Sequence, residues 1–357
     1  MSKIYPRKPA NLTVTWAQSI VAQHDRGATV RGLELSNVDV GTTTRVHLNV
    51  EYDGPQSLPR RWFVKLPSLN RRARLITALA GVLPAEVRFY LEVLPNIPVA
   101  VPLCLAAHSQ FGLGSVLVLA DVIESGATPG QPSDALTLQQ AVAVIEQLGS
   151  LHARFWNKVH DIPAHRLLAG QAQRLEDGLG TALAVPLMKR GLRLAGTHIP
   201  LSLHAPALHY ARHRRKAMRY LADAPQTLVH HDCHAGNLFW SQDFSKPGFL
   251  DWQLVRLGEG MGDVAYFLAS ALDVDSRRQH ETSLLACYLE ALARGGVTGI
   301  DSSKLMLRYR AHLTYAFEAM VVTLAIGGMM ELSSNLELIK RTSAAVADND
   351  AFAALPV

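Results

Sequence analysis

The sequence is poor in cysteine and contains no long apolar run. Its three cysteines, Cys104, Cys233 and Cys287, are far apart and form no CxxC pair, so we expect neither a disulfide framework nor a cysteine zinc site. The longest apolar stretch, at 319–330, is too short to span a bilayer and predicts a buried helix. The first residues lack the apolar core of a signal peptide. These absences favour a soluble protein of a reducing, cytoplasmic compartment.

Charged residues are also scarce. They make up 18% of the chain, against 48% hydrophobic residues, which is a globular composition without a signature of disorder. The formal net charge of +5 favours anionic partners such as nucleotides. The basic runs at 60–65 and 212–216 are short, whereas nucleic-acid binding depends on many clustered phosphate contacts. We therefore expect neither a nucleic-acid partner nor a membrane partner, and the sequence leaves the oligomeric state open.

The first third of the chain is rich in strand signals. Alternating and β-branched segments predict strands at 42–52, 60–67, 101–108 and 114–122. Helical patterns interrupt them at 70–81 and 84–94, with Pro84 placed as a first-turn residue.

The remaining two thirds are mainly helical in pattern. Apolar residues recur at helical intervals near 134–156, 208–222, 262–273, 279–294 and 303–330. This change predicts an α+β protein with a small β-rich N-terminal unit at 1–120, a connector at 121–124 and a larger helical unit at 125–357.

Polar residues that can carry chemistry gather in one segment, LVHHDCHAGNLFW at 228–240, which is followed by DWQ at 251–253. The stretches NLFW and GFL predict two short strands joined by a turn, which would bring Asn237 and Asp251 together. Two oxygen ligands on adjacent strands suit Mg²⁺. Asp232, five positions before Asn237, could then accept a proton from an attacking hydroxyl. An Asp, an Asn five residues later and a further Asp are the pattern of phosphoryl transfer in the protein-kinase fold.

The string HHDCHAGNLFW…LDWQ…GDVAYFLA resembles the aminoglycoside phosphotransferase and choline kinase superfamily, and most of all its ecdysteroid-kinase-like branch. The resemblance covers roughly residues 28–272. It implies a bilobal protein-kinase-like fold, with a small β-rich N-lobe and a larger, mainly helical C-lobe. It also implies a small-molecule kinase that uses ATP and Mg²⁺. The chain departs from the family at His231, where the family usually has Gly, and at Ala120, where it often has Glu.

The resemblance implies a role for each matching residue. Asp232 would be the catalytic base, and Asn237 and Asp251 would hold Mg²⁺. Lys65 would contact the α- and β-phosphates, with Glu86 fixing it in place. His230 and Asp263 would support the catalytic loop. The implied nucleotide cradle consists of Gly41, Thr42 and Thr43 in the turn before Lys65, and of the connector residues Leu119, Ala120, Asp121 and Val122, whose backbone would meet the adenine.

Three functional hypotheses remain at this point. The leading one is an ATP- and Mg²⁺-dependent transfer of phosphate to a hydroxyl of a small molecule, with a neutral or partly apolar acceptor favoured by the apolar residues of the C-terminal helices. The second is a degraded kinase that binds nucleotide without turnover. The third is a metal-dependent hydrolase with His230, Asp232 and His234 as ligands on one face of a strand.

Overall fold

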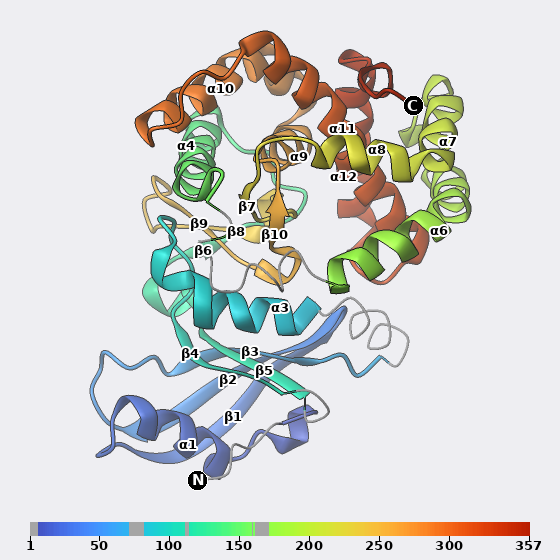
Figure 1. Cartoon of the computed structure of the whole chain (residues 1–357). Helices are drawn as coiled ribbons and strands as arrows, with labels where there is room; N and C mark the ends of the chain where they lie inside the picture. The colour runs from blue at the N-terminus through green and yellow to red at the C-terminus, as the bar shows by residue number, and fades with distance from the viewer. Residues whose placement is uncertain (1–5, 71–81, 111–113, 159, 161–170) are drawn as a thin grey trace.

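The computed structural model describes residues 6–70, 82–110, 114–158, 160 and 171–357. Figure 1 shows two parts, a β-sheet with helices α1 and α3 on the side of the N-terminus and a larger helical part that holds the C-terminus. The predicted α+β architecture, with a small β-rich part and a larger, mainly helical part, is confirmed. Among the described residues, no helix combines the length and the apolar character that a bilayer crossing requires.

The N-terminal part is built on one antiparallel sheet of five strands in the order β1-β2-β3-β5-β4. The strands are β1 (Thr29–Val40), β2 (Thr43–Asp53), β3 (Arg61–Pro67), β4 (Cys104–Gln110) and β5 (Gly114–Ala120). The four strand predictions are therefore confirmed, with ends shifted by up to three residues.

Successive side chains of β3 point to opposite faces of the sheet, and the two faces have different contacts. Trp62, Val64 and Leu66 are buried on one face, where the indole of Trp62 meets that of Trp16 at a centroid distance of 6.1 Å. Trp16 belongs to helix α1 (Val14–His24), which the sequence analysis did not predict. Lys65 points to the opposite face, because successive side chains of a strand alternate.

Helix α3 (Val82–Arg88) covers that opposite face and lies between the sheet and the helical part (Figure 1). It continues as a π-helical turn at Phe89–Val93 and a 3-10 turn at Leu94–Asn96. The helix predicted at 84–94 is thus present in a less regular form. Most of the helix predicted at 70–81 falls on residues 71–81, which lie outside the described residues.

The connector between the two parts follows β5 directly. Asp121 caps a 3-10 turn at Val122–Ser125 by accepting a hydrogen bond from the N–H of Ile123. Gly126 ends this turn with φ of 80°, a left-handed conformation that glycine adopts without steric penalty.

The helical part contains α4 (Leu138–Phe155), α6 (Gln171–Ala195), α7 (His204–Arg212), α8 (Arg214–Ala222), α9 (Met261–Ala271), α10 (Val274–Arg294), α11 (Ser302–Ile326) and α12 (Leu332–Asp348). The helix predicted at 208–222 is in fact two helices that meet at His213. The helix predicted at 303–330 ends at Ile326, because Gly327 and Gly328 take positive φ angles and break the helix. Helices α6 and α12 were not predicted.

Short strands lie where the two parts meet. β7 (Thr227–Val229) pairs with β10 (Arg256–Gly258), and β8 (Leu238–Trp240) pairs with both β6 (Thr128–Pro129) and β9 (Pro247–Phe249). The predicted hairpin is confirmed, since Leu238 lies opposite Phe249 in an antiparallel register.

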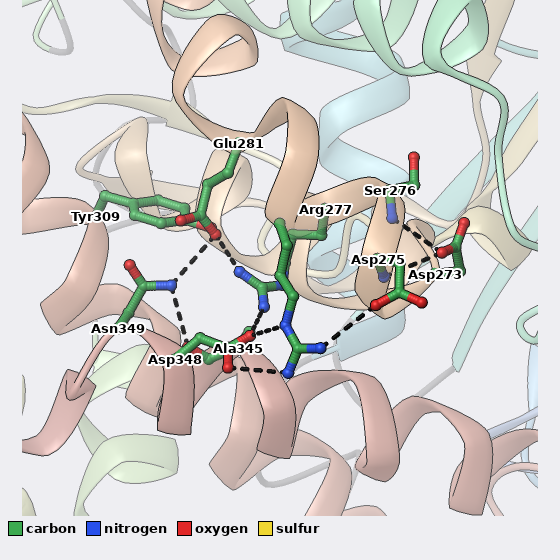
Figure 2. A network of polar contacts seen from close by, with 10 residues as sticks. Asp273, Asp275, Ser276, Arg277, Glu281, Tyr309, Ala345, Asp348 and Asn349 are labelled. Carbon is green, nitrogen blue, oxygen red and sulfur yellow. Dashed lines mark hydrogen bonds and ion pairs between the residues drawn. The ribbon is translucent and has the colours of Figure 1, made fainter.

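Buried arginines hold the C-terminal helices in place. Arg277 on α10 is 2% exposed and pairs with Glu281 and Asp348, and Tyr309 donates to the same Glu281 (Figure 2). Arg341 on α12 donates from its guanidinium to the backbone carbonyl oxygens of residues 133, 134 and 270 at 2.7 to 3.0 Å. Buried charges of this kind need partners of opposite charge or hydrogen-bond acceptors. Among the described residues, the Nε of Arg277 alone of these guanidinium nitrogens is buried without an acceptor.

Candidate active site

The segment between β7 and β8 forms a loop whose backbone is held from behind. The carboxylate of Asp263, in the first turn of α9, accepts hydrogen bonds from the N–H groups of His230 and His231, each at 2.7 Å. His152 on α4 lies 3.3 Å from the same carboxylate. Burial alone would raise the pKa of Asp263, but the hydrogen bond and charge of His152 help to hold this pKa below its ordinary value. Asp263 therefore lies where the sequence analysis expected it.

His230 is fixed on both ring nitrogens. Its Nε2 lies 2.7 Å from the carbonyl oxygen of Leu250, to which it can only donate, and its Nδ1 accepts from the N–H of Asp232 at 3.3 Å. The ring also packs against Trp252 at a centroid distance of 4.7 Å. Both nitrogens are occupied, so His230 supports the loop and is not free to bind a metal.

His231 has a backbone conformation that explains the usual glycine at its position. Its φ is 70°, in the left-handed region that glycine favours and that histidine tolerates better than most residues. The ring stacks on Tyr315 at 4.5 Å, while its buried Nε2 meets no hydrogen-bond partner among the described residues. Burial, then the charge of Arg256, lowers the pKa of His231 well below its ordinary value, so the ring is neutral near pH 7.

The carboxylate of Asp232 accepts two hydrogen bonds from side chains. Asn237 donates from Nδ2 to Oδ2 at 3.0 Å, and the same nitrogen donates to the Asp232 carbonyl oxygen at 2.8 Å. Tyr266 donates from its hydroxyl to Oδ1 at 2.8 Å. Because the amide nitrogen of Asn237 is occupied, its amide oxygen is the atom left to act as a metal ligand.

The β8–β9 hairpin brings the segments of Asn237 and Asp251 together. The N–H of Leu250 donates to the carbonyl oxygen of Asn237 at 2.8 Å, just before Asp251. Asp251 takes a left-handed conformation with φ of 55°, and such strained residues occur often at functional sites. An amide oxygen and a carboxylate are the donor types that Mg²⁺ prefers, so the residues present fit this ion.

Lys65 joins the sheet to this hairpin. Its ammonium lies 2.7 and 3.0 Å from the two carboxylate oxygens of Glu86 on α3 and 2.7 Å from Oδ1 of Asp251. Glu86 also accepts a hydrogen bond from the N–H of Trp252 at 3.1 Å. Lys65 and Glu86 are 3% and 0% exposed, so their charged groups have almost no contact with water, whereas Asp251 is 19% exposed.

Two carboxylates share the single ammonium of Lys65, and this sets their titration. Burial raises the pKa of Glu86 to about 7, because Lys65 offsets the burial only in part. Burial would also raise the pKa of Asp251, but the charge and hydrogen bond of Lys65 hold it below its ordinary value. The pKa of Lys65 is itself raised by Asp251 and Glu86, against the effect of burial. Lys65 and Asp251 are therefore charged at neutral pH.

The turn between β1 and β2 reaches the same region. The Thr42 hydroxyl lies 3.4 Å from the side-chain oxygen of Gln253, two residues after Asp251. The N–H of Gly41 donates to the carbonyl oxygen of Thr43 at 2.9 Å and so closes the turn on itself. Gly41 does not take a positive φ angle, and its conformation therefore does not require glycine.

The connector offers fewer backbone groups to a nucleotide than the sequence suggested. The N–H of Ala120 donates to the carbonyl oxygen of Leu103 at 2.8 Å, and that of Asp121 donates to Arg61 at 2.9 Å. Within the predicted stretch Leu119–Val122, these two donors are already used by the protein.

The hydrolase hypothesis is not supported by the geometry. Among the described parts of the chain, no three His, Cys, Asp or Glu side chains are grouped so as to hold a metal ion. His234, the third ligand of that hypothesis, lies 3.9 Å from Asp232, and its Nδ1 accepts a hydrogen bond from the N–H of Gly236.

Two residues at the site were missed by the sequence analysis as functional candidates. His152 contacts Asp263, and Tyr266 contacts Asp232. A signal for Tyr266 was present, because it follows Asp263 by three positions on a predicted helix, and residues at this spacing share one helix face. His152 carries no such local signal.

Comparison with known proteins agrees with the predicted protein-kinase-like fold. A family model described as the phosphotransferase enzyme family, APH, matches residues 50–298. The chain belongs to this family, and it is a phosphotransferase of the small-molecule kinase type.

Solved structures show the same fold at low sequence identity. A choline kinase from Cryptosporidium parvum Iowa II is 12% identical, with a TM-score of 0.52 over 90% of this chain and 89% of that chain. A protein from Ralstonia eutropha JMP134, provisionally named as an aminoglycoside phosphotransferase, is 15% identical, with a TM-score of 0.51 over 96% of this chain and 98% of that chain. No curated protein matches the sequence.

Proposed function

We propose that the protein transfers the γ-phosphate of ATP, with Mg²⁺, to a hydroxyl group of a small molecule. The observation that carries the proposal is the bonded unit of Asp232 and Asn237, beside the cluster of Lys65, Glu86 and Asp251. Together, the unit and the cluster provide a base, two oxygen ligands and a buried ammonium on neighbouring segments. Phosphoryl transfer needs these parts and little else, because its catalysis is mostly positioning and charge neutralisation.

Each residue has one task in the reaction. Lys65 holds the α- and β-phosphates, and Glu86 keeps the lysine stem in place. Asn237 and Asp251 hold the Mg²⁺ ion, which supplies positive charge to the phosphate oxygens when it is bound. Asp232 orients the acceptor hydroxyl and takes its proton.

At the γ-phosphorus, one bond forms and one bond breaks. The acceptor oxygen forms a bond to this phosphorus while the bond to the bridging oxygen breaks, and ADP leaves with the electron pair. The hydroxyl proton goes to the carboxylate of Asp232. His230 and Asp263 keep the loop rigid, so that this carboxylate does not move during the transfer.

We further propose that the nucleotide lies under the β1–β2 turn, with Gly41, Thr42 and Thr43 near the phosphates. The adenine would lie against the connector residues Leu119, Ala120, Asp121 and Val122. It would bond to connector groups other than the two N–H donors that are already used. ATP binding can be followed by calorimetry without knowledge of the acceptor.

The charges near His231 favour a neutral acceptor over a polycation. Among the described residues near His231, Glu318 is already paired with Arg214 at 2.6 Å, and Glu259 is already paired with His312 at 2.6 Å. A polycationic acceptor such as an aminoglycoside needs free carboxylates, whereas the stacked rings of His231 and Tyr315 suit an uncharged, partly apolar molecule.

The test is a comparison of three proteins. Wild type is screened with ATP and a panel of aminoglycosides, macrolides, sugars, choline-like alcohols and sterols, with ADP release as the readout. Asp232→Ala should lose turnover but still bind ATP. Asp275→Ala is the control. It makes the same chemical change as Asp232→Ala, but at a side chain on α10 that is 93% exposed. Full turnover by Asp232→Ala would refute the assignment of the base.

A further inference from the structure

Helix α9 contacts the catalytic loop at two positions on one face. Asp263 holds the loop backbone, and Tyr266, three residues later, reaches the side chain of Asp232. Residues three apart lie on the same face of a helix. A single turn of α9 therefore fixes both the path of the loop and the direction of its carboxylate.

The hydroxyl of Tyr266 cannot easily find another partner. The side chain is 3% exposed, and a buried hydroxyl without a hydrogen bond is unfavourable. Burial, then the charge of Asp232, raises the pKa of Tyr266 well above its ordinary value. The hydroxyl keeps its proton at any working pH, so it is always the donor and the carboxylate is always the acceptor.

Both oxygens of the Asp232 carboxylate thus have one protein donor each. Tyr266 binds Oδ1 at 2.8 Å and Asn237 binds Oδ2 at 3.0 Å. A carboxylate oxygen has two lone pairs, so each oxygen keeps one position for a further hydrogen bond. The two donors fix the plane of the carboxylate and hence the direction of these remaining positions.

We propose that Tyr266 is a positioning residue that aims Asp232 at the acceptor hydroxyl. The proposal rests on the proposed function, since it assigns Tyr266 a task only if Asp232 is the base. Tyr266 does not touch the reacting atoms and exchanges no proton. Without the hydrogen bond from Tyr266 to Oδ1, the carboxylate can rotate out of line with the acceptor hydroxyl.

The experiment compares Tyr266→Phe with a matched variant, Tyr309→Phe. Tyr309 is also fully buried and donates to a carboxylate, Glu281, at 2.7 Å, but it belongs to the network of α10, α11 and α12 (Figure 2). Phosphate release from ATP with water as acceptor gives a rate that does not depend on the unknown alcohol. Thermal unfolding of both variants shows how much stability each loses.

The expected result separates kcat from KM. Tyr266→Phe should lower kcat by about tenfold or more, on the scale of a hydrogen bond to a charged group, while KM for ATP stays within about twofold. Tyr309→Phe should keep the wild-type kcat and the wild-type KM for ATP. In the Asp232→Ala background, Tyr266→Phe should have no further effect, because it acts only through Asp232.

Two different failures are distinguishable. If wild type releases no phosphate from ATP and phosphorylates no alcohol of the panel, the proposed function falls, and the positioning role with it. If wild type is active and Tyr266→Phe matches Tyr309→Phe in kcat, only the role of Tyr266 is overturned.

A second variant covers the case in which Tyr266→Phe does not fold. Tyr266→3-fluorotyrosine keeps the ring and the hydroxyl but makes the hydroxyl a stronger donor. This variant should keep kcat within about twofold of wild type, because the donor to Asp232 is retained, and a loss of about tenfold would contradict the proposal.

Discussion

Replacing Lys65 by methionine tests the buried cluster that joins the two parts of the protein. The variant keeps the apolar stem and removes the ammonium that contacts Glu86 and Asp251. Two carboxylates are then left without a cation, one of them 0% exposed and the other 19% exposed. Leaving a buried charge without its partner destabilises a protein by about 3–5 kcal/mol.

The size of the effect should depend on pH. Glu86 already has a raised pKa of about 7, and without Lys65 its carboxyl is protonated still more easily. At pH 8 wild-type Glu86 is mostly ionised and gains from Lys65, whereas at pH 5.5 it carries a proton in both proteins. The loss should therefore be smaller at pH 5.5 than at pH 8 by about 1 kcal/mol. With an unfolding entropy of about 2.1 cal/mol/K per residue, a loss of about 3–5 kcal/mol lowers Tm by about 4–7 °C in a chain of 357 residues.

Urea unfolding followed by tryptophan fluorescence at both pH values measures this loss. Lys340→Met is the control, because Lys340 is 59% exposed and lies 3.4 Å from Glu337, and exposed pairs contribute at most about 1 kcal/mol. If Lys65→Met and Lys340→Met unfold at the same urea concentration at pH 8, the reasoning about the buried cluster is wrong.

Three further predictions follow from the same structure. The folded-state pKa of Glu86 is raised from 4.5 to about 7. Its contribution to stability is therefore present at low pH and is lost as pH rises through this window. Glu86→Gln should reduce the resulting decrease in the urea midpoint between pH 4 and pH 8. His231→Gly should stay within about 1 kcal/mol of wild type in stability, because glycine relieves the left-handed backbone, whereas the β-branched His231→Val should lose at least about 2 kcal/mol in the same unfolding assay. Arg277→Met leaves Glu281 without its buried cation, whereas Asp348 keeps Arg278 at 2.8 Å, so thermal unfolding should show a loss of about 3 kcal/mol with no change in ATP affinity.

The fold was predictable where local pattern and tertiary packing agree. The strands around β3 alternate clearly, and α9 is apolar and regular, so both were found from the sequence. Helix α6 was missed because Gly178, Gly180 and Pro186 weaken its helical pattern, and only its packing against α11 overrides these residues. The end of α11 was misplaced because the sequence does not tell whether a glycine pair continues a helix or breaks it.

The site was predictable as far as a motif marks it. The sequence placed Asp232, Asn237 and Asp251 together, because a short hairpin fixes how two nearby strands pair. The link from Lys65 to Asp251 spans 186 positions, and nothing local in the sequence encodes it. The contact of Tyr266 with Asp232 depends on which face of α9 turns to the loop, and this is set by packing across several helices.

The hydrogen bonds from Arg341 to three backbone carbonyl oxygens limit how far the protein can be shortened. The family model stops at residue 298, yet α12 supplies a guanidinium to residues 133, 134 and 270. A protein cut at the family boundary would expose the apolar side of α9 and leave those acceptors without their donor. We expect such a fragment to aggregate on expression, so the smallest useful unit for crystallisation or assay extends beyond Arg341.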